Sequence, residues 1–206
     1  MFVYERRYFM RKLVQMLIVV CMVVFSVQVA FASSDKVTIH KDANDQDADL
    51  ASIHRLAIGL PMYTPVDEKD PTKEEITQAI YDASKVARSY VISYDIAADD
   101  IKRDKGVDIK ALDRHKAAPE FKNNIAKYAD AYVILTVANN NGITCFFDVY
   151  KAGTDDLLYT YQVVSGRWDK ASVETYKKLS EQFFKNFERS ADDQQKKAEK
   201  EAKKKK

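Results

Sequence analysis

Two cysteines and three histidines are the residues of this sequence best suited to nucleophilic catalysis. Cys21 lies inside an apolar run near the amino terminus, which leaves Cys145 as the thiol of the predicted domain. A catalytic thiolate needs a neighbouring base and a donor for the oxyanion, and His115 is the histidine deepest in that domain. Cys145 lies in the middle of an apolar strand pattern. We therefore predict a buried, inert thiol and no catalytic residues.

The histidines and several aspartates also have the chemistry of metal ligands. The histidines lack the four-residue spacing and the companion cysteines of a zinc site: His40, His54 and His115. Three alternate aspartates resemble the start of a calcium loop: Asp45, Asp47 and Asp49. Such a loop continues with glycine and ends in glutamate, but Leu50 and Leu56 occupy those positions. We predict no metal site; a loose contact of His40 and His54 with a divalent ion stays open.

Carboxylates and glycines offer two further kinds of site. Four aspartates cluster near a predicted short helix: Asp99, Asp100, Asp104 and Asp108. A glycosidase needs two carboxylates on opposite sides of a sugar cleft, which one helix face does not provide. The five glycines form no phosphate-binding motif. These observations predict a solvated acidic face, no cofactor and no enzymatic activity.

A loop after the first predicted strand is the candidate binding site. The apolar run 56–60 ends at Pro61, and the loop continues with Met62, Tyr63 and Pro65. Open α/β sheets bind ligands at the carboxyl ends of their strands, where this loop begins. We predict that it forms a contact surface for a partner. The alternative is that Met62 and Tyr63 only pack over the edge of the sheet.

The amino-terminal residues have the pattern of a signal peptide. Residues 13–27 are apolar and uncharged, follow Arg11 and Lys12, and precede the small-residue pattern at 30–32. We predict a signal peptide over 1–32, export across the inner membrane, and a periplasmic, cell-surface or secreted protein. An amino-terminal membrane anchor is the alternative, although the run is shorter than the ~20 residues that span a bilayer.

Charge divides the remaining chain into three parts. The formal net charge of +2 combines a net +3 for residues 1–32, a net −4 for residues 33–189 and a net +3 for residues 190–206. A basic nucleic-acid-binding core is therefore excluded. We predict an acidic leader over 33–53, a single domain over 54–189 and a disordered Lys-rich tail over 190–206. The tail lysines are available for electrostatic contact with an anionic membrane or wall polymer.

Hydrophobic periodicity predicts the first half of the domain. A strand over 56–60 is followed by a helix that begins at a capping box of Thr72 and Glu75, and a second strand covers 90–94. Two strands joined by a helix form a parallel β-α-β unit. Short helices are predicted over 97–105, closed by Gly106, and over 108–114 and 119–128. A central strand is predicted over 131–138.

The second half predicts an antiparallel meander and a final helix. Asn and Gly residues at 139–142 favour a hairpin between the central strand and a strand over 143–150, and a last strand covers 157–164. The final helix begins near Asp169 or Ser172. Its apolar residues have helical spacing: Val173, Tyr176, Leu179, Phe183 and Phe187. The fold class is α/β (α+β), with the carboxyl-terminal helix packing on one mixed sheet.

Four short motifs support a resemblance to a known group of domains: residues 56–58 followed by Pro61, residues 94–106, residues 129–134, and residues 148–158. They resemble the small α/β domain of the amino-terminal part of TolB, of CsgG, and of the lipoproteins that activate penicillin-binding proteins. No lipid-anchor cysteine or pore-forming insertion is recognisable. The resemblance implies a non-catalytic bacterial envelope protein that binds another macromolecule. A binder of a small molecule or cell-wall fragment, or a degenerate hydrolase, is the alternative.

Overall fold

The structure is a computed structural model of the 206-residue chain, and it describes residues 38–40, 48–139, 142–154, 156–166 and 169–204. The predicted signal peptide over 1–32 lies outside the described residues. So do Asp45 and Asp47 of the aspartate pattern in the leader. Asp49, the third aspartate of that pattern, caps a short 3₁₀ turn, because its Oδ1 accepts the Ala51 N–H at 3.1 Å.

One mixed sheet organises the described chain. Its strands are β1 (Thr38–His40), β2 (Arg55–Ile58), β3 (Tyr90–Ile92), β4 (Ala131–Asn139), β5 (Ile143–Lys151) and β6 (Leu157–Val164), in the order β1-β6-β5-β4-β2-β3. β2 is parallel to both β3 and β4, whereas β4, β5 and β6 form antiparallel pairs. The predicted β-α-β unit, the meander and the mixed α/β class are confirmed.

The helix of the β-α-β unit begins at the capping box that the sequence predicts. Helix α2 (Lys73–Ala83) starts after Thr72, whose Oγ1 accepts the Glu75 N–H at 3.1 Å. The Glu75 carboxylate accepts the Thr72 N–H in return, at 2.7 Å. Two backbone donors that the first helical turn leaves open are therefore satisfied.

Two predicted boundaries differ from the structure because capping residues come earlier than expected. Ser93 ends β3 and caps α3 (Tyr94–Lys105), since its Oγ accepts the Ile96 N–H at 3.2 Å. Gly106 closes α3 with a φ of 72°, as predicted for a left-handed residue. A 3₁₀ turn (Ile109–Ala111) follows, and α4 (Arg114–Ile125) contains Pro119 instead of starting there. Proline has no backbone N–H, so one carbonyl in the preceding turn loses its helical hydrogen bond. Because Pro119 is exposed, water can donate to that carbonyl instead.

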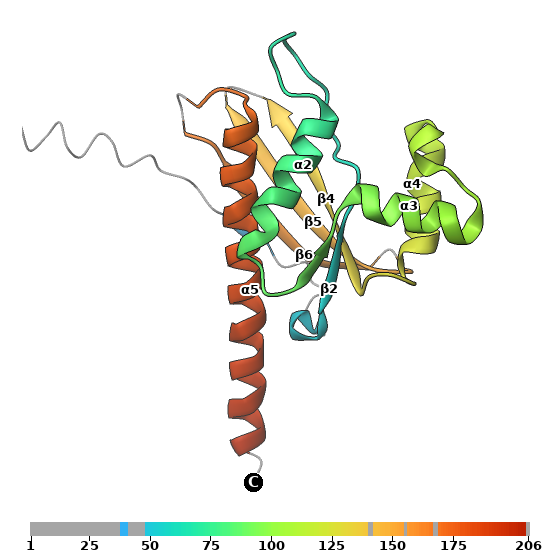
Figure 1. Cartoon of the computed structure of the whole chain (residues 1–206). Helices are drawn as coiled ribbons and strands as arrows, with labels where there is room; N and C mark the ends of the chain where they lie inside the picture. Colours follow the sequence, from blue (N-terminus) through green and yellow to red (C-terminus); the bar gives the residue numbers. More distant parts are fainter. Residues whose placement is uncertain (1–37, 41–47, 140–141, 155, 167–168, 205–206) are drawn as a thin grey trace, which may run out of the picture. The chain divides into compact units, whose positions relative to one another are not determined.

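Two helical layers sandwich the sheet. Helices α2 and α5 (Val173–Lys204) pack on one face, and α3 and α4 cover β2, β3 and β4 on the other face (Figure 1). β2 is buried on both sides, because Leu56 and Ile58 face α2 and α5 while Ala57 faces α3 and α4. Its almost uninterrupted apolar sequence is the pattern of a central strand.

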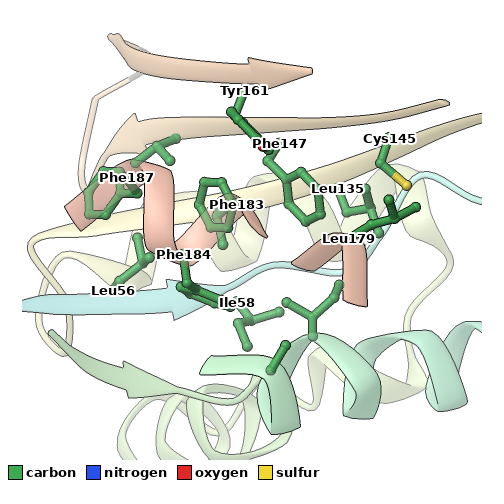
Figure 2. Close-up of a cluster of buried hydrophobic side chains, with 14 of the residues drawn as sticks. Leu56, Ile58, Leu135, Cys145, Phe147, Tyr161, Leu179, Phe183, Phe184 and Phe187 are labelled. Carbon is green, nitrogen blue, oxygen red and sulfur yellow. The ribbon is translucent and has the colours of Figure 1, made fainter. Parts of the chain in front are cut away.

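Aromatic rings fill the core between α5 and the meander. Figure 2 shows the side chains of Phe183, Phe184 and Phe187 directed from α5 into the buried cluster. Phe183 stacks on Phe147 of β5, with ring centroids 4.6 Å apart. The predicted alternation of β5 is confirmed, since Phe147 and every second neighbour are buried: Ile143, Cys145, Phe147 and Val149. Burial of this surface is the main stabilising contribution to the fold.

Helix α5 continues well beyond the end predicted for the domain. Ser172 caps it, because its Oγ accepts the Thr175 N–H at 3.2 Å, and the helix ends at Lys204. The sequence predicted disorder from residue 190, whereas the structure has helix there up to Lys204. Long-range contacts hold its middle turns: Ala191 is buried, and the Gln194 Oε1 accepts the Leu50 N–H at 3.0 Å. Glu, Lys, Gln and Ala then favour helix to its end.

Part of the predicted acidic leader also joins the fold. Leu50 and Ile53 are only 1% and 7% exposed and belong to the core beneath α2 and α5. β1 pairs antiparallel with β6 and forms an edge of the sheet. Two apolar side chains among many aspartates were too weak a pattern to predict this packing. Among the described residues, no helix is long and apolar enough to cross a bilayer.

Candidate functional site

The candidate site is the loop that follows β2. The first residues of this loop run alongside β4 and bond with its backbone. The Gly59 N–H donates to the Val133 carbonyl at 2.8 Å, and the Met62 N–H donates to the Leu135 carbonyl at 2.7 Å. The Val137 N–H then donates to the Met62 carbonyl at 3.0 Å. A side chain at Gly59 would crowd this pairing, because its Cβ would lie 3.3 Å from the Val133 oxygen. The start of the loop is therefore fixed by backbone hydrogen bonds.

The far part of the loop is held by a single aspartate. The Asp70 Oδ2 accepts the N–H groups of Val66 and Asp67 at 2.9 and 3.0 Å. Pro71 is buried next to it and leads directly into the capped start of α2. Bonds at both ends give the loop one defined backbone conformation, so a partner would meet a preformed surface.

The four predicted contact residues divide into two buried and two exposed side chains. Tyr63 is 3% exposed and packs edge-on against Tyr176 of α5, with centroids 5.8 Å apart. Burial raises the pKa of the Tyr63 hydroxyl above its ordinary value. Pro61 is buried, whereas Pro65 is exposed and Met62 is 48% exposed. Of the two residues that the alternative concerned, Tyr63 packs over the sheet edge and Met62 is exposed, and the use of the loop as a contact surface stays a prediction.

A small pocket lies beside this loop on the α4 side of the sheet. Its volume is about 40 Å³. Its walls come from the residues after β2, from the start of α3, from α4 and from β4: Gly59, Leu60, Tyr94, Arg114, Ala117, Ala118, Phe121, Lys122 and Ile134. Sites for small molecules usually measure ~300–1,000 Å³, so this pocket holds a water or two rather than a substrate.

Arg114 lines this pocket and was not singled out from the sequence. Its Nη1 donates to the Pro61 carbonyl at 3.1 Å, which joins the first turn of α4 to the loop. Its neighbour His115, the base considered for catalysis, is exposed. A capping Asp113 just before them is the signal that could have placed Arg114 in the first turn of a helix.

Cys145 has the surroundings of a structural thiol. It is fully buried in the core between α5 and β5, beside the labelled Leu135 and Leu179 in Figure 2. Burial raises the pKa of its thiol to about 12. His115 lies on α4, and α4 packs on the opposite face of the sheet. The structure does not bring together the base and the thiol that a cysteine nucleophile needs.

The aspartate cluster forms ion pairs that join α3 to its neighbours. Asp104 accepts hydrogen bonds from Lys127 and from the Tyr128 hydroxyl, and these hold the pKa of its carboxyl well below its usual range. Lys102 contacts Asp108 at 2.6 Å. Lys110 also pairs with Asp95 and Asp99 of α3, whereas Arg103 pairs with Asp100 and Asp104 inside that helix. These carboxylates are engaged in surface contacts.

Asp148 is a carboxyl group whose pKa is raised by partial burial. It lies on β5, on the face of the sheet opposite Cys145, and its Oδ1 accepts the Thr160 hydroxyl at 2.8 Å. Its direct neighbours across the strands, Ile134 and Thr160, do not titrate. Neither supplies the second group of an acid-base pair. Within the described part of the chain, no three His, Cys, Asp or Glu residues form a group suited to a metal ion.

Comparisons with known proteins show similarity of structure only. No protein-family model matches the sequence, and no curated protein matches it. The LpoB C-terminal domain from Escherichia coli is 13% identical, with a TM-score of 0.42 over 60% of this chain and 91% of that one. The PelC dodecamer from Paraburkholderia phytofirmans gives 8% identity and a TM-score of 0.39, over 71% and 92% of the two chains.

A lipoprotein is also similar to part of this chain. Lipoprotein GNA1162 from Neisseria meningitidis is 14% identical, with a TM-score of 0.33 over 58% of this chain and 86% of that one. LpoB and this lipoprotein are structural neighbours of the chain at low identity. The resemblance inferred from the sequence, including that to TolB and CsgG, stays a prediction.

Proposed function

We propose that this protein is an exported, non-enzymatic module that binds another macromolecule of the bacterial envelope through the surface around Met62. One observation carries the proposal. At the carboxyl edge of its parallel strands the pocket measures about 40 Å³, while Met62 and Val66 of the adjoining loop are 48% and 79% exposed. A closed surface with exposed apolar side chains suits a macromolecule better than a substrate.

The rigidity of the loop supports this use. Met62 is exposed on a backbone that β4 holds by two hydrogen bonds, and Asp70 fixes the segment that carries Val66. A partner that docks here would not have to order the loop, so little conformational entropy would oppose binding. Methionine also adapts its shape to different apolar partners. Export itself rests on the signal-peptide pattern of residues 1–32.

Site-specific crosslinking in bacterial cells tests the proposal. A photoreactive amino acid at Met62 should capture a reproducible envelope partner that mass spectrometry identifies. Tyr90 is the matched control, because it is 65% exposed and is the first residue of β3. It therefore lies at the amino ends of the parallel strands, whereas Met62 follows the carboxyl end of β2. Tyr63 and Phe187 are unsuitable positions, since they are 3% and 1% exposed. No partner from Met62, or the same proteins from both positions, would overturn the proposal.

The alternative of a small-molecule or wall-fragment binder is separated by thermal-shift screening. A ligand that binds only the folded state raises the melting temperature by mass action. Glycans, peptides and divalent ions should leave the melting temperature unchanged if the pocket of about 40 Å³ is all that this edge offers. A saturable rise with one of these compounds would favour the alternative over the macromolecular partner.

A further inference from the structure

The outward face of α5 carries a row of basic side chains. The basic stripe consists of six residues, all of them exposed: Lys178, Lys185, Arg189, Lys196, Lys200 and Lys203. At 3.6 residues per turn these positions fall within an arc of about 60°. A rise of 1.5 Å per residue gives the stripe a length of about 38 Å. Lys197 and Lys204, both exposed, extend it on one flank.

This stripe points away from the body of the sheet. The buried residues of α5 lie on the opposite side of the helix: Tyr176, Leu179, Ser180, Phe183, Phe184, Phe187 and Ala191. Figure 1 shows α5 running beside α2 and then continuing past the sheet toward its carboxyl end. The last of the buried residues is Ala191, so the part of the stripe from Lys196 onward extends past the core contacts of the helix.

Most acidic residues of α5 border one flank of the stripe. Five of the seven fall in an arc of roughly 40°, centred about 70° around the helix from the stripe: Glu174, Glu181, Glu188, Asp192 and Glu199. Glu188 and Asp192 are bound by Arg88, and Lys185 lies 3.8 Å from Glu181. The other two, Asp193 and Glu201, lie on the opposite flank, toward Lys197 and Lys204. The charge of α5 is therefore arranged in adjacent rows of opposite sign.

We infer that the basic stripe binds a single strand of a linear, phosphodiester-linked polymer of the cell envelope. The inference goes beyond the proposed function, which uses a different surface, and shares with it only the envelope location. A strand can follow the stripe along its length, between the acidic row on one flank and Asp193 on the other. Seven of these eight cations are lysines, which bind phosphate as point charges and do not require the planar two-bond geometry of arginine.

The acidic row disfavours a membrane as the partner of the stripe. A planar bilayer in contact with the stripe would also approach the acidic row. The row lies about 70° around the helix from the stripe, so its carboxylates are only a few ångströms farther from the bilayer plane than the stripe cations are. That distance is shorter than the Debye length of about 8 Å at physiological salt, so anionic lipids would repel the acidic row. A narrow polymer strand avoids much of this repulsion.

Titration with a labelled polymer tests the inference. The purified protein should bind fluorescent poly(glycerol phosphate) in an anisotropy assay, with an affinity that falls steadily as salt rises. The variant K196Q/K200Q/K203Q should bind about tenfold more weakly and show a shallower salt dependence. The matched control K69Q/K105Q/K170Q removes the same charge from exposed positions elsewhere and should stay within about twofold of the original affinity. Circular dichroism checks that both variants are folded.

Each other outcome would overturn the inference. Equal losses in both variants would mean that net charge, not the stripe, attracts the polymer. Tighter binding to anionic phospholipid vesicles, or to single-stranded DNA, would identify a different partner class. A dimer at low salt that the stripe variant dissociates, without polymer binding, would mean that α5 pairs with a second copy. Crosslinking at Met62 is independent of all these results, so failure here leaves the proposed function standing.

Discussion

Glu188 shows how one side chain can attach a helix to a distant connection. Its Oε1 accepts the N–H groups of Arg88 and Ser89 at 2.9 and 3.1 Å and the Ser89 hydroxyl at 2.9 Å. Its Oε2 accepts the Arg88 Nε at 2.9 Å. These bonds join α5 to the segment between α2 and β3, about a hundred residues earlier in the chain.

Replacing Glu188 should therefore destabilise the protein more than its partial exposure suggests. We expect Glu188→Gln to lower the free energy of unfolding by about 1–2 kcal/mol, because charge-assisted bonds to two backbone donors are lost or weakened. Urea denaturation measures the change. Glu181→Gln is the control on the same helix, with one ion pair at 3.8 Å, and it should change stability by less than about 0.5 kcal/mol. Equal effects would mean that the Glu188 contacts add nothing.

The same carboxylate predicts a dependence of stability on pH. Partial burial opposes ionisation of Glu188, but the bonds from Ser89 and Arg88 outweigh it, and its pKa lies below the ordinary 4.5. A carboxyl whose pKa is lowered by folding stabilises the folded state above 4.5, and this contribution is lost as pH falls through its folded-state pKa. The stability difference between the original protein and Glu188→Gln should thus be constant near neutral pH and shrink below 4.5. A difference that grew in acid would contradict this sign.

At the scale of elements, α5 shows where local sequence patterns stop being informative. The spacing of Tyr176, Phe183 and Phe187 was enough to predict an amphipathic helix. Beyond Phe187 that apolar pattern ends, and the sequence alone favoured disorder. The bond between Gln194 and Leu50 spans 144 residues, so no local pattern could indicate it. The extra turns of α5 depend on such contacts and then continue by helix propensity.

Two truncations separate these contributions to α5. A chain that ends after Gln195 keeps Ala191, Asp192 and Gln194 and should lose less than about 0.5 kcal/mol of stability, because the removed turns are exposed. A chain that ends after Arg189 should lose about 2–3 kcal/mol, since buried Ala191, the Arg88 contact of Asp192 and the Leu50 bond disappear. Thermal unfolding followed by circular dichroism measures both. Similar stabilities would show that the middle turns of α5 are not held by these contacts.

At the scale of the whole molecule, the sequence predicted the order of the elements better than their long-range packing. Alternation in β5 and the capping box at Thr72 are local patterns, and both are present in the structure. Placement of β4 beside β2 brings the meander onto the parallel pair, which local periodicity does not specify. The candidate loop was located at the carboxyl end of β2, but the burial of Tyr63 depends on Tyr176, more than a hundred residues later.

Tyr63 consequently connects the exposed loop to the whole core. Its ring seals the edge of the sheet against Tyr176, and Met62 is presented from the residue before it. Tyr63→Ala should create a cavity and lower the free energy of unfolding by about 3 kcal/mol. Crosslinking at Met62 should fall as well, because the surface that presents Met62 loses its support.

Tyr63→Phe is the matched variant, because it keeps the ring and removes only a hydroxyl whose pKa burial already raises. It should cost about 1 kcal/mol or less and leave crosslinking at Met62 intact. Chemical denaturation and the Met62 crosslinking yield, measured on both variants, check the pair. Full crosslinking by a folded Tyr63→Ala protein would show that backbone pairing with β4 alone positions Met62, so that the loop acts independently of α5. Loss of crosslinking in both variants would instead place the Tyr63 hydroxyl itself at the centre of the site.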